Sequence, residues 1–452
     1  MSGERTLHPA IQAWYDAHGR EVEELARTIW AHPEPAMEEF TACRAAGSFL
    51  EAQGFSVKTY HCRDEALPPN TVEATAGSGF PVIGIYGEYD ALPGLGQEAV
   101  PRPAPIPGCG HGCGHSLMTP AGASAAAAAW RALQAENLPG TIRFIACPAE
   151  ETGEGKAELL RHGAFDGLDC CLAWHPMGHD LTPFEGELQA LASYRFEFFG
   201  QAAHAAQNPD MGRSALDAAE LMNVGVQYLR EHVPPDVRIH YSYLSAGDKP
   251  NIVPAYAALH YMIRARDTRH NEEVIARVKA IARGAAMMAG VETRDTLLSS
   301  TTETRIVHSF NRFLYEAAQA VPPLRCTEEE EAFARELYER VCGPCPPGFD
   351  PLPRKLVPPA GRAVPMTGST DAGPLTKMVP TARLFGLGVV RGIPGHHWGV
   401  TACAGSSIGR KAALFAGKAM AQCALETARH PERIALWKEE LKEAENGTSE
   451  TG

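Results

Sequence analysis

The stretch PVIGIYGEYDALPG, residues 81–94, joins a short apolar strand pattern directly to a polar turn. Two further stretches repeat this arrangement, TIRFIACPAEE at 141–151 and GLDCCLAWHP at 167–176. They end on a pair of glutamates and on a histidine. Since helical patterns separate the apolar runs, we predict an α/β sheet with helices on its faces. Such sheets bind ligands at the carboxyl ends of their strands, where these polar groups would gather.

The pattern of the chain changes after residue 190 and changes back after residue 303. Between these points, alternating strands and two amphipathic helices follow in the order strand, helix, strand, strand, helix, which predicts a compact inserted α+β unit. The expected parts are a catalytic domain at 1–190, an inserted domain at 191–303, the rest of the catalytic domain at 304–435 and a tail at 436–452. Residues 322–365 are rich in Pro and Glu and are expected to form a surface excursion.

Composition excludes several classes of protein. The formal net charge is -13, which repels nucleic acid and anionic membrane surfaces, and no basic stripe with interleaved aromatics is present. We find no signal peptide and no uninterrupted apolar stretch of about 20 residues that would suggest a membrane span. Twelve scattered cysteines favour a reducing, cytoplasmic setting, and Cys342-x-x-Cys345 is more simply a loop pair than a redox or zinc motif.

The octamer GHGCGHSL, residues 110–117, has three interpretations. Cys113 and His115 are suitable ligands for a borderline-soft metal such as zinc. They are equally suited to act as a thiolate with an adjacent base. The third interpretation is a glycine-rich turn with a buried cysteine, because glycine lets the backbone turn tightly.

Three later clusters favour the metal interpretation. Glu150 and Glu151 end an apolar strand, and a metallohydrolase needs one carboxylate as ligand and one as general base. His175 ends the next strand, and PGHHWG at 394–399 offers a late histidine. Solvated glutamates and structural histidines are the ordinary alternatives for each cluster alone. Together they supply enough ligands and a spare carboxylate for two metal ions in an open catalytic site.

The ordered set of motifs resembles a known family over nearly the whole chain, about residues 10–425. The motifs are GEYDALPG, GHGCGHSLMTPA, PAEETGEGKA, AWHP, FFGQAAHAA, KPNIVPAYA, GSTDAG and PGHHWG. They resemble the aminoacylase/carboxypeptidase-type metallopeptidases with a co-catalytic metal pair (peptidase clan MH). Within that family they are most similar to the amidohydrolase branch with a cysteine ligand, and there to the aminobenzoyl-glutamate hydrolase B-subunit group.

The resemblance implies a fold and a set of metal ligands. The fold is a mixed sheet with helices on both faces, of the phosphorylase/hydrolase-like type, with an inserted ferredoxin-like lid that mediates dimerisation. The ligands of two divalent ions, zinc or manganese, would be Cys113, His115, Glu151, His175 and His396. In this branch the cysteine thiolate bridges the metals. Glu150 would be the general base, and Asp90 would orient a ligand histidine. The ligand assignment between His396 and His397 stays open.

The same resemblance assigns residues of the inserted domain to substrate binding. His204 would reach the active site of the partner subunit and stabilise the oxyanion, and Asn251 would help hold the substrate carbonyl. Arg264 would bind a substrate carboxylate through its guanidinium, with Arg266 as the alternative and a solvated strand edge as the ordinary explanation of both. Ser116 replaces an acidic or amide residue that often follows the ligand histidine, and Asp371 in GSTDAG faces the site without an assigned role.

The implied reaction is hydrolysis of an amide bond by metal-activated water with a glutamate general base. The expected substrate is an N-acyl amino acid or a dipeptide-like amide with a free carboxylate, similar to aminobenzoyl-glutamate. A dipeptidase or carboxypeptidase of the same family is the alternative. A hydrolase with Cys113 as nucleophile and a non-catalytic binding protein are the competing classes. A homodimer through the lid is expected, and a heteromer with a related subunit stays open.

Overall fold

The computed structural model describes residues 6–447, which divide into two compact units. Unit 1 contains residues 6–186, 305–364 and 375–447, and unit 2 contains Glu187–Thr304 and Pro365–Pro374. The segment 365–374, which the sequence assigned to the second part of the catalytic domain, packs with unit 2 instead. This segment follows the strand pair formed by β9 (Gly186–Glu187) and β14 (Val364–Pro365).

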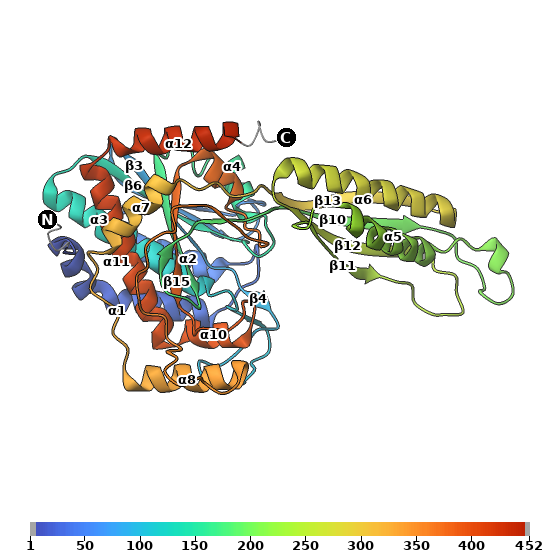
Figure 1. Cartoon of the computed structure of the whole chain (residues 1–452), viewed down its shortest axis with the longest axis horizontal. Helices are drawn as coiled ribbons and strands as arrows, with labels where there is room; N and C mark the ends of the chain where they lie inside the picture. The colour runs from blue at the N-terminus through green and yellow to red at the C-terminus, as the bar shows by residue number, and fades with distance from the viewer. Residues whose placement is uncertain (1–5, 448–452) are drawn as a thin grey trace. The chain divides into compact units, whose positions relative to one another are not determined.

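Unit 1 is built on a seven-stranded mixed sheet with the order β1-β2-β6-β3-β7-β15-β8 (Figure 1). Its strands are β1 (Ser56–Tyr60), β2 (Thr71–Ser78), β3 (Val82–Glu88), β6 (Gly140–Cys147), β7 (Cys170–Met177), β8 (Thr182–Pro183) and β15 (Thr381–Gly388). The four central strands β6, β3, β7 and β15 are parallel, whereas β1, β2 and β8 are antiparallel to their neighbours. The predicted α/β class is therefore confirmed.

Helices cover both faces of this sheet, as expected. Helices α2 (Phe40–Ala52), α3 (Met118–Glu136), α4 (Gly155–Arg161), α7 (His308–Ala318) and α11 (Ser407–Arg429) pack directly on its strands. The other helices outside residues 187–304 are α1 (Pro9–Ala31), α8 (Glu328–Cys342), α9 (Gly373–Met378), α10 (Trp398–Gly405) and α12 (Arg433–Gly447). Helix α3 connects β3 to β6, and α4 connects β6 to β7 in the opposite direction along the sheet. Since such crossovers are right-handed, the two helices lie on opposite faces.

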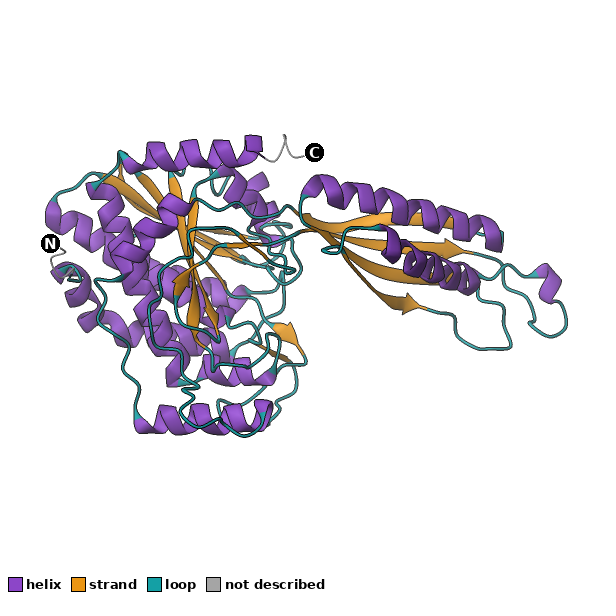
Figure 2. Cartoon of the chain, viewed as in Figure 1, coloured by secondary structure: helices purple, strands orange, loops and turns teal. Residues whose placement is uncertain are grey.

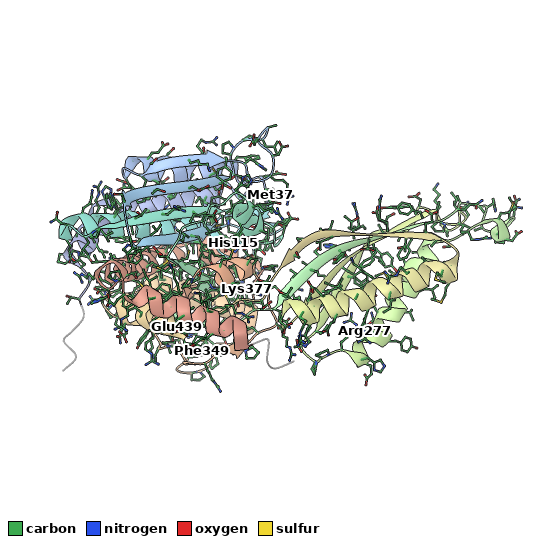
Figure 3. The ribbon with its side chains drawn as sticks, turned by 90° about the horizontal axis from the view of Figure 1, so that it is seen from above. Met37, His115, Arg277, Phe349, Lys377 and Glu439 are labelled. Atoms are coloured by element: carbon green, nitrogen blue, oxygen red, sulfur yellow. The ribbon has the colours of Figure 1, made fainter. Side chains whose placement is uncertain are left out.

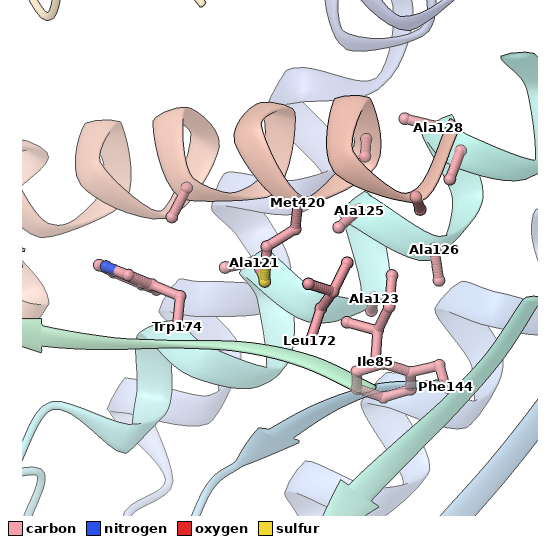
Figure 4. Packing of buried hydrophobic residues seen from close by; sticks show 14 of the residues in the cluster. Ile85, Ala121, Ala123, Ala125, Ala126, Ala128, Phe144, Leu172, Trp174 and Met420 are labelled. Carbon is pink, nitrogen blue, oxygen red and sulfur yellow. The ribbon is translucent and has the colours of Figure 1, made fainter. Parts of the chain in front are cut away.

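The core of unit 1 centres on α3, which lies between the sheet and α11 (Figure 4). Every residue from Met118 to Ala129 is buried, and most of them are alanine, glycine or serine. Small side chains let α11 and the sheet approach α3 closely from different sides. In Figure 4, Met420 of α11 points towards Ala121 and Leu172. The alanine-rich run is thus a buried helix, as its composition predicts.

The direction of the connections determines where a ligand site can form. The connection after β3 leads away from β7 to β6, and the chain after β7 continues on the opposite side of β7, first in β8 and later in β15. Open α/β sheets bind ligands at such a switch point, beyond the carboxyl ends of the two strands. Here those ends carry the EYD turn after β3 and His175 in β7.

Unit 2 is a four-stranded antiparallel sheet of order β11-β12-β10-β13 with two helices packed on it (Figure 2). Its elements are β10 (Ala190–Phe199), α5 (Ala215–Leu229), β11 (Arg238–Ser245), β12 (Tyr256–Ala265), α6 (Thr268–Ala289) and β13 (Glu292–Thr301). The chain order βαββαβ with this strand order is the expected ferredoxin-like arrangement. Apolar residues of β10 and β12, such as Phe196 and Leu259, form its core with α5 and α6.

Two segments differ from their sequence-based description. The excursion at 322–365 contains α8, and Leu337 of this helix is buried against Val390 and Ile393 in a small core of its own. The tail expected from residue 436 instead continues α12, where Trp437 stacks on Phe310 with 3.9 Å between ring centroids. Apolar residues spaced along otherwise charged sequence account for both differences. Among residues 6–447, no helix has the length and apolarity that crossing a membrane requires.

Candidate metal centre

Cys113 and His115 lie in a glycine-rich loop between β5 (Cys109–Gly110) and α3. β5 pairs with β4 (Leu92–Pro93), so this loop is bound to the EYDALP turn that follows β3. Gly114 has a φ of +85°, and a Cβ on it would lie 2.7 Å from Cγ of Pro176. A residue other than glycine would be strained at this φ, and its Cβ would collide with Pro176. Glycine therefore allows the loop to pass close to the end of β7. Figure 3 labels His115 among the side chains of unit 1.

A first group of ligand atoms comes from Cys113, His115 and His175, and all three atoms lie within 4.8 Å of one another. His115 donates from Nδ1 to the Asp90 carboxylate at 2.8 Å, and His175 Nδ1 lies 2.9 Å from the carbonyl oxygen of Pro176. These contacts leave Nε2 of each ring as the ligand atom, which is how metal-binding histidines are usually oriented. Nε2 of His175 lies 3.4 Å from the Cys113 sulfur.

A second group contains Cys113, Glu151 and His396, again within 4.8 Å. His396 Nε2 lies 3.2 Å from Oε2 of Glu151. His396 has a φ of +55°, an unusual conformation for a residue other than glycine that often marks a functional site. His397 instead caps α10, because its Nδ1 accepts a hydrogen bond from the Gly399 N–H at 3.1 Å. The structure therefore brings His396, and not His397, into the cluster.

The electrostatics of the cluster favour a thiolate. Burial alone would raise the pKa of Cys113, but the positive charges of His115 and His175 lower it well below the usual value. Burial alone would lower the pKa of His115, but the charges of Cys113 and Asp90 raise it well above the usual value. The thiolate is the form of cysteine that binds metals and the form that attacks carbonyl groups. Charge alone therefore does not separate the two uses of Cys113.

Glu150 is half-buried beside His115, and an oxygen of Glu88 completes a third group within 4.8 Å. Glu88 was not among the predicted site residues, although it is part of the quoted GEYD turn. Its Oε1 accepts a hydrogen bond from Lys156 at 2.5 Å, and both side chains are buried. Breaking a buried ion pair of this kind typically costs about 3–5 kcal/mol. No sequence signal identifies Lys156, which resembles any lysine near a helix start.

His111 lies outside the groups of candidate ligand atoms. Its Nε2 lies 3.1 Å from the carbonyl oxygen of Ile29, and burial lowers its pKa to about 4. A neutral, buried ring bonded to the backbone fits a structural role and not that of a metal ligand. Asp371 is also buried and belongs to the segment that packs with unit 2.

His204 and Asn251 lie together in unit 2. A bridge pairs His204 with Ile252, and the Ala205 N–H donates to the carbonyl of Asn251 at 3.1 Å. Nδ1 of His204 accepts hydrogen bonds from the N–H groups of Ala206 and Gln207 at 3.2 and 3.1 Å. Its Nε2 therefore carries the proton and is the atom that can donate to an oxyanion.

Arg264 lies at the other end of the same strands. β10 and β12 pair Leu191 with Arg264 at one end and Phe199 with Tyr256 at the other. At about 3.3 Å per residue, these ends are roughly 26 Å apart. His204 lies beyond the Phe199 end, because the Val253 N–H continues the pairing to the carbonyl of Ala203. Within one chain, His204 and Arg264 are too far apart to contact the same small molecule.

Arg264 is half-buried, and its Nε donates to the Ser369 hydroxyl at 3.2 Å. Nη1 lies 3.5 Å from Nδ1 of His240, and burial lowers the pKa of Arg264. Among the described residues it has no carboxylate partner. Arg266 is exposed, and its side chain contacts Asp267 and His270. The arrangement favours Arg264 over Arg266 as the arginine for an anion.

Known proteins resemble this chain along most of its length. The model of peptidase family M20/M25/M40 matches residues 84–402. The B-subunit of p-aminobenzoyl-glutamate hydrolase from Escherichia coli (strain K12) is 36% identical over 437 residues, 90% of this chain and 89% of that protein. The Xaa-Arg dipeptidase of Mus musculus is 33% identical over 279 residues, 59% of this chain and 60% of that protein.

A solved structure with the same fold is a dinuclear metal binding peptidase from the M20 family of Bacillus subtilis. Its TM-score is 0.61 at 18% identity, and the match covers 92% of this chain and 99% of that one. This likeness concerns the fold, which includes both the mixed sheet with its helices and the inserted unit.

Proposed function

The chain belongs to peptidase family M20/M25/M40 and is an amide-cleaving hydrolase of that family, and from this premise we propose its substrate class and the roles of its residues. The substrate is an N-acyl amino acid, or a dipeptide-like amide, with a free carboxylate. The observation that carries the proposal is that Cys113 belongs to two ligand groups at once, with Glu150 beside them. A hydrolase with a cysteine nucleophile has no need of the second group.

The residues present fit a pair of divalent metal ions. Among the described residues, Nε2 of His115 and Oε1 of Glu151 are buried and form no hydrogen bond, which leaves both available as ligand atoms. One ion would be held by Cys113, His115 and His175, and the other by Cys113, Glu151 and His396. Divalent ions there would acidify a water and polarise the substrate carbonyl. We propose zinc or manganese, and the shared thiolate favours zinc.

Glu150 acts as the general base in this proposal. It accepts a proton from water as the water oxygen attacks the amide carbon, and it returns the proton to the departing amine nitrogen as the C–N bond breaks. Its carboxylate lies in the group with Glu88 and His115, and His115 also belongs to the first ligand group. The ion pair with Lys156 holds Glu88 in place, so that Glu150 keeps a defined neighbour.

We propose that the active enzyme is a homodimer in which His204 acts on the substrate held in the other protomer. The separation of roughly 26 Å or more between His204 and Arg264 in one chain supports this, because a small substrate cannot span it. Arg264 would bind the substrate carboxylate, and His204 Nε2 and Asn251 of the other protomer would hold the oxyanion.

Mixing two inactive variants tests this division of roles. His204→Ala and Glu150→Gln dimers are each expected to be nearly inactive. After subunit exchange at equal amounts, activity should recover to about one quarter of wild type, since half the dimers then hold one complete site. Turnover before and after exchange is the measurement, with each variant incubated alone as the control. No recovery in a sample shown to contain mixed dimers would contradict a contribution in trans.

A substrate panel with metal analysis tests the proposed function as a whole. The panel contains p-aminobenzoyl-glutamate, other N-acyl amino acids and Xaa-Arg dipeptides, which represent the named activities of the two relatives. Chelation should abolish turnover and added zinc or manganese should restore it. Turnover that survives complete chelation but is lost on thiol alkylation would instead favour a Cys113 nucleophile. Preference for free dipeptides over N-acyl amino acids would favour the dipeptidase alternative.

Metal loading should depend on pH in a defined direction. Hydrogen bonds to Cys113 and then to Glu151 raise the pKa of His396 to about 10, so in the metal-free protein this ring is protonated at neutral pH. A metal must displace that proton. Apparent metal affinity should therefore rise with pH, by up to about tenfold per unit for each proton released. Competition with a chromogenic chelator at pH 6 and pH 8 measures it, and equal affinity at both would contradict the role of His396.

The cysteines and the name of one relative support proposals on location and wider assembly. Among the described residues, none of the twelve cysteines forms a disulfide, which supports a reducing, cytoplasmic compartment. One relative is named as one of the subunits of a hydrolase, so we propose that a related subunit is a partner of this chain as well. Size measurement of the purified chain, alone and with such a subunit, distinguishes the homodimer from the heteromer.

A further inference from the structure

Two buried carboxylates hold the backbone on either side of Glu150. Oε1 of Glu39 accepts a hydrogen bond from the Ala149 N–H at 2.7 Å. Oδ2 of Asp90 accepts one from the Glu151 N–H at 2.9 Å. Glu39 is fully buried and Asp90 nearly so, although each comes from a different part of the chain. The backbone N–H groups of the residues before and after Glu150 therefore both donate to fixed acceptors.

The backbone between these acceptors has an unusual conformation. Ala149 has a φ of +55°, which costs a residue with a Cβ energy unless its surroundings hold it there. Its carbonyl accepts hydrogen bonds from the N–H groups of Glu154 and Gly155 at 3.3 and 3.2 Å, and the Gly153 N–H donates to the carbonyl of Glu150 at 2.8 Å. These bonds fix the turn after Glu150. The bond to Glu39 fixes the strained residue before it.

A further hydrogen bond, to its other carboxylate oxygen, holds the Glu39 side chain in place. It is the N-cap residue of α2, yet its side chain makes no capping hydrogen bond. Its Oε2 accepts a hydrogen bond from Nδ2 of Asn70 at 3.4 Å, and Asn70 Oδ1 in turn accepts one from the N–H of Cys62. The first N–H groups of α2 donate instead to the Glu34 carboxylate, which accepts hydrogen bonds from the N–H groups of Thr41 and Ala42 at 2.7 and 3.0 Å. The Glu39 side chain is therefore not needed to cap α2 and binds the loop of Glu150.

We infer that Glu39 is a positioning residue, which fixes the Glu150 carboxylate through its hydrogen bond to the Ala149 N–H. The inference rests on the proposed role of Glu150 as general base. Glu39 touches neither substrate nor metal ligand side chain, and it acts only through the backbone. Because catalysis is sensitive to displacements of about 1 Å, a looser backbone at Ala149 would lower turnover without removing any reacting group.

Two substitutions separate the hydrogen bond from the charge. Glu39→Gln keeps an acceptor oxygen of the same reach and loses the charge. Burial, followed by the charge of Asp90, raises the pKa of Glu39 to about 8, so a neutral side chain is already tolerated near neutral pH. Glu39→Asp keeps the ionisable carboxyl and withdraws the acceptor by one methylene, while Glu34 continues to bind the first N–H groups of α2. The fold is therefore retained in both variants.

The expected results follow from the loss or retention of that acceptor. Glu39→Asp should lower kcat by about 10- to 100-fold, with KM within about threefold of wild type. Glu39→Gln should stay within about threefold of wild type in both. Both variants should bind two metal ions, measured by elemental analysis. Hydrogen exchange at the peptide containing Ala149 should accelerate in Glu39→Asp alone.

The matched control is Glu330→Asp. Glu330 is another buried glutamate at a helix start, where it completes the capping box of α8 and binds Lys411 and Ser407. Shortening it should change neither kcat nor exchange at Ala149. Wild-type kcat in Glu39→Asp, equal impairment in both Glu39 variants, or loss of metal from Glu39→Asp would each overturn the inference. Hydrogen exchange needs no substrate. It therefore tests whether Glu39 holds the Ala149 backbone even where the proposed substrate class or the proposed general base is wrong.

Discussion

Glu150→Gln is expected to lower kcat on the order of 10³-fold while the protein keeps both metal ions. The substitution leaves the size and the backbone of residue 150 unchanged and removes only the ability to accept a proton from water. Glu150 belongs to the third group, with Glu88 and His115, and to neither of the two groups that share Cys113, so the two proposed metal sites keep all their ligands. Steady-state kinetics with elemental analysis of the same sample measure both effects together.

The same turn provides a control for this experiment. Glu154 lies four residues further on and forms an ion pair with Arg63 at 2.7 Å, outside the three ligand groups. Glu154→Gln should retain activity within about twofold, because a partly exposed ion pair contributes little. A fully active Glu150→Gln protein would refute the general-base assignment. Loss of metal from it would show that Glu150 is a ligand instead.

Cys113→Ala is expected to abolish tight binding of both metal ions and to lower kcat/KM on the order of 10³-fold or more, because metal ions supply several kcal/mol of transition-state stabilisation. Cys113 is the one residue common to the two metal groups with His175 and His396, so its removal weakens both sites together. Cys113→Asp keeps an anionic side chain and should retain more metal than Cys113→Ala. Elemental analysis after dialysis, with turnover of the same samples, is the measurement.

Cys109→Ala is the matched control, since Cys109 lies in β5, directly before the same loop, and outside the described ligand groups. It should keep its metal and its activity. If Cys113→Ala bound two metal ions normally yet lost all turnover, Cys113 would be a nucleophile and not a bridging ligand. Loss of one metal ion alone would show that the thiolate serves a single site.

Much of the fold follows from local patterns. Apolar runs that end in polar residues predicted β3, β6 and β7, and alanine content predicted the burial of α3. The sequence analysis did not identify β2 and β13, whose strands mix polar and small residues and are stabilised by partners distant in the chain. α8 was missed for a similar reason, because most of its residues are charged and only its contacts reveal the buried face.

The candidate site shows the same limit of sequence reasoning. Motifs predicted the residues that the structure brings into the two metal groups, because the residue types that bind metals can be read directly from the sequence. Glu39 and Lys156 carry no such signal: their importance depends on partners 110 and 68 residues away. The choice between His396 and His397 depends on backbone geometry, since one has a positive φ and the other caps α10.

The alanine-rich helix α3 has a mechanical consequence for this site. It begins three residues after His115, and its buried alanines have no rotamers through which they could adapt to a neighbour. A displacement of α11 or of the sheet would therefore shift α3 as a rigid body and carry the ligand loop with it. We therefore expect few substitutions in α3 to be tolerated, even at positions far from any group that takes part in the chemistry.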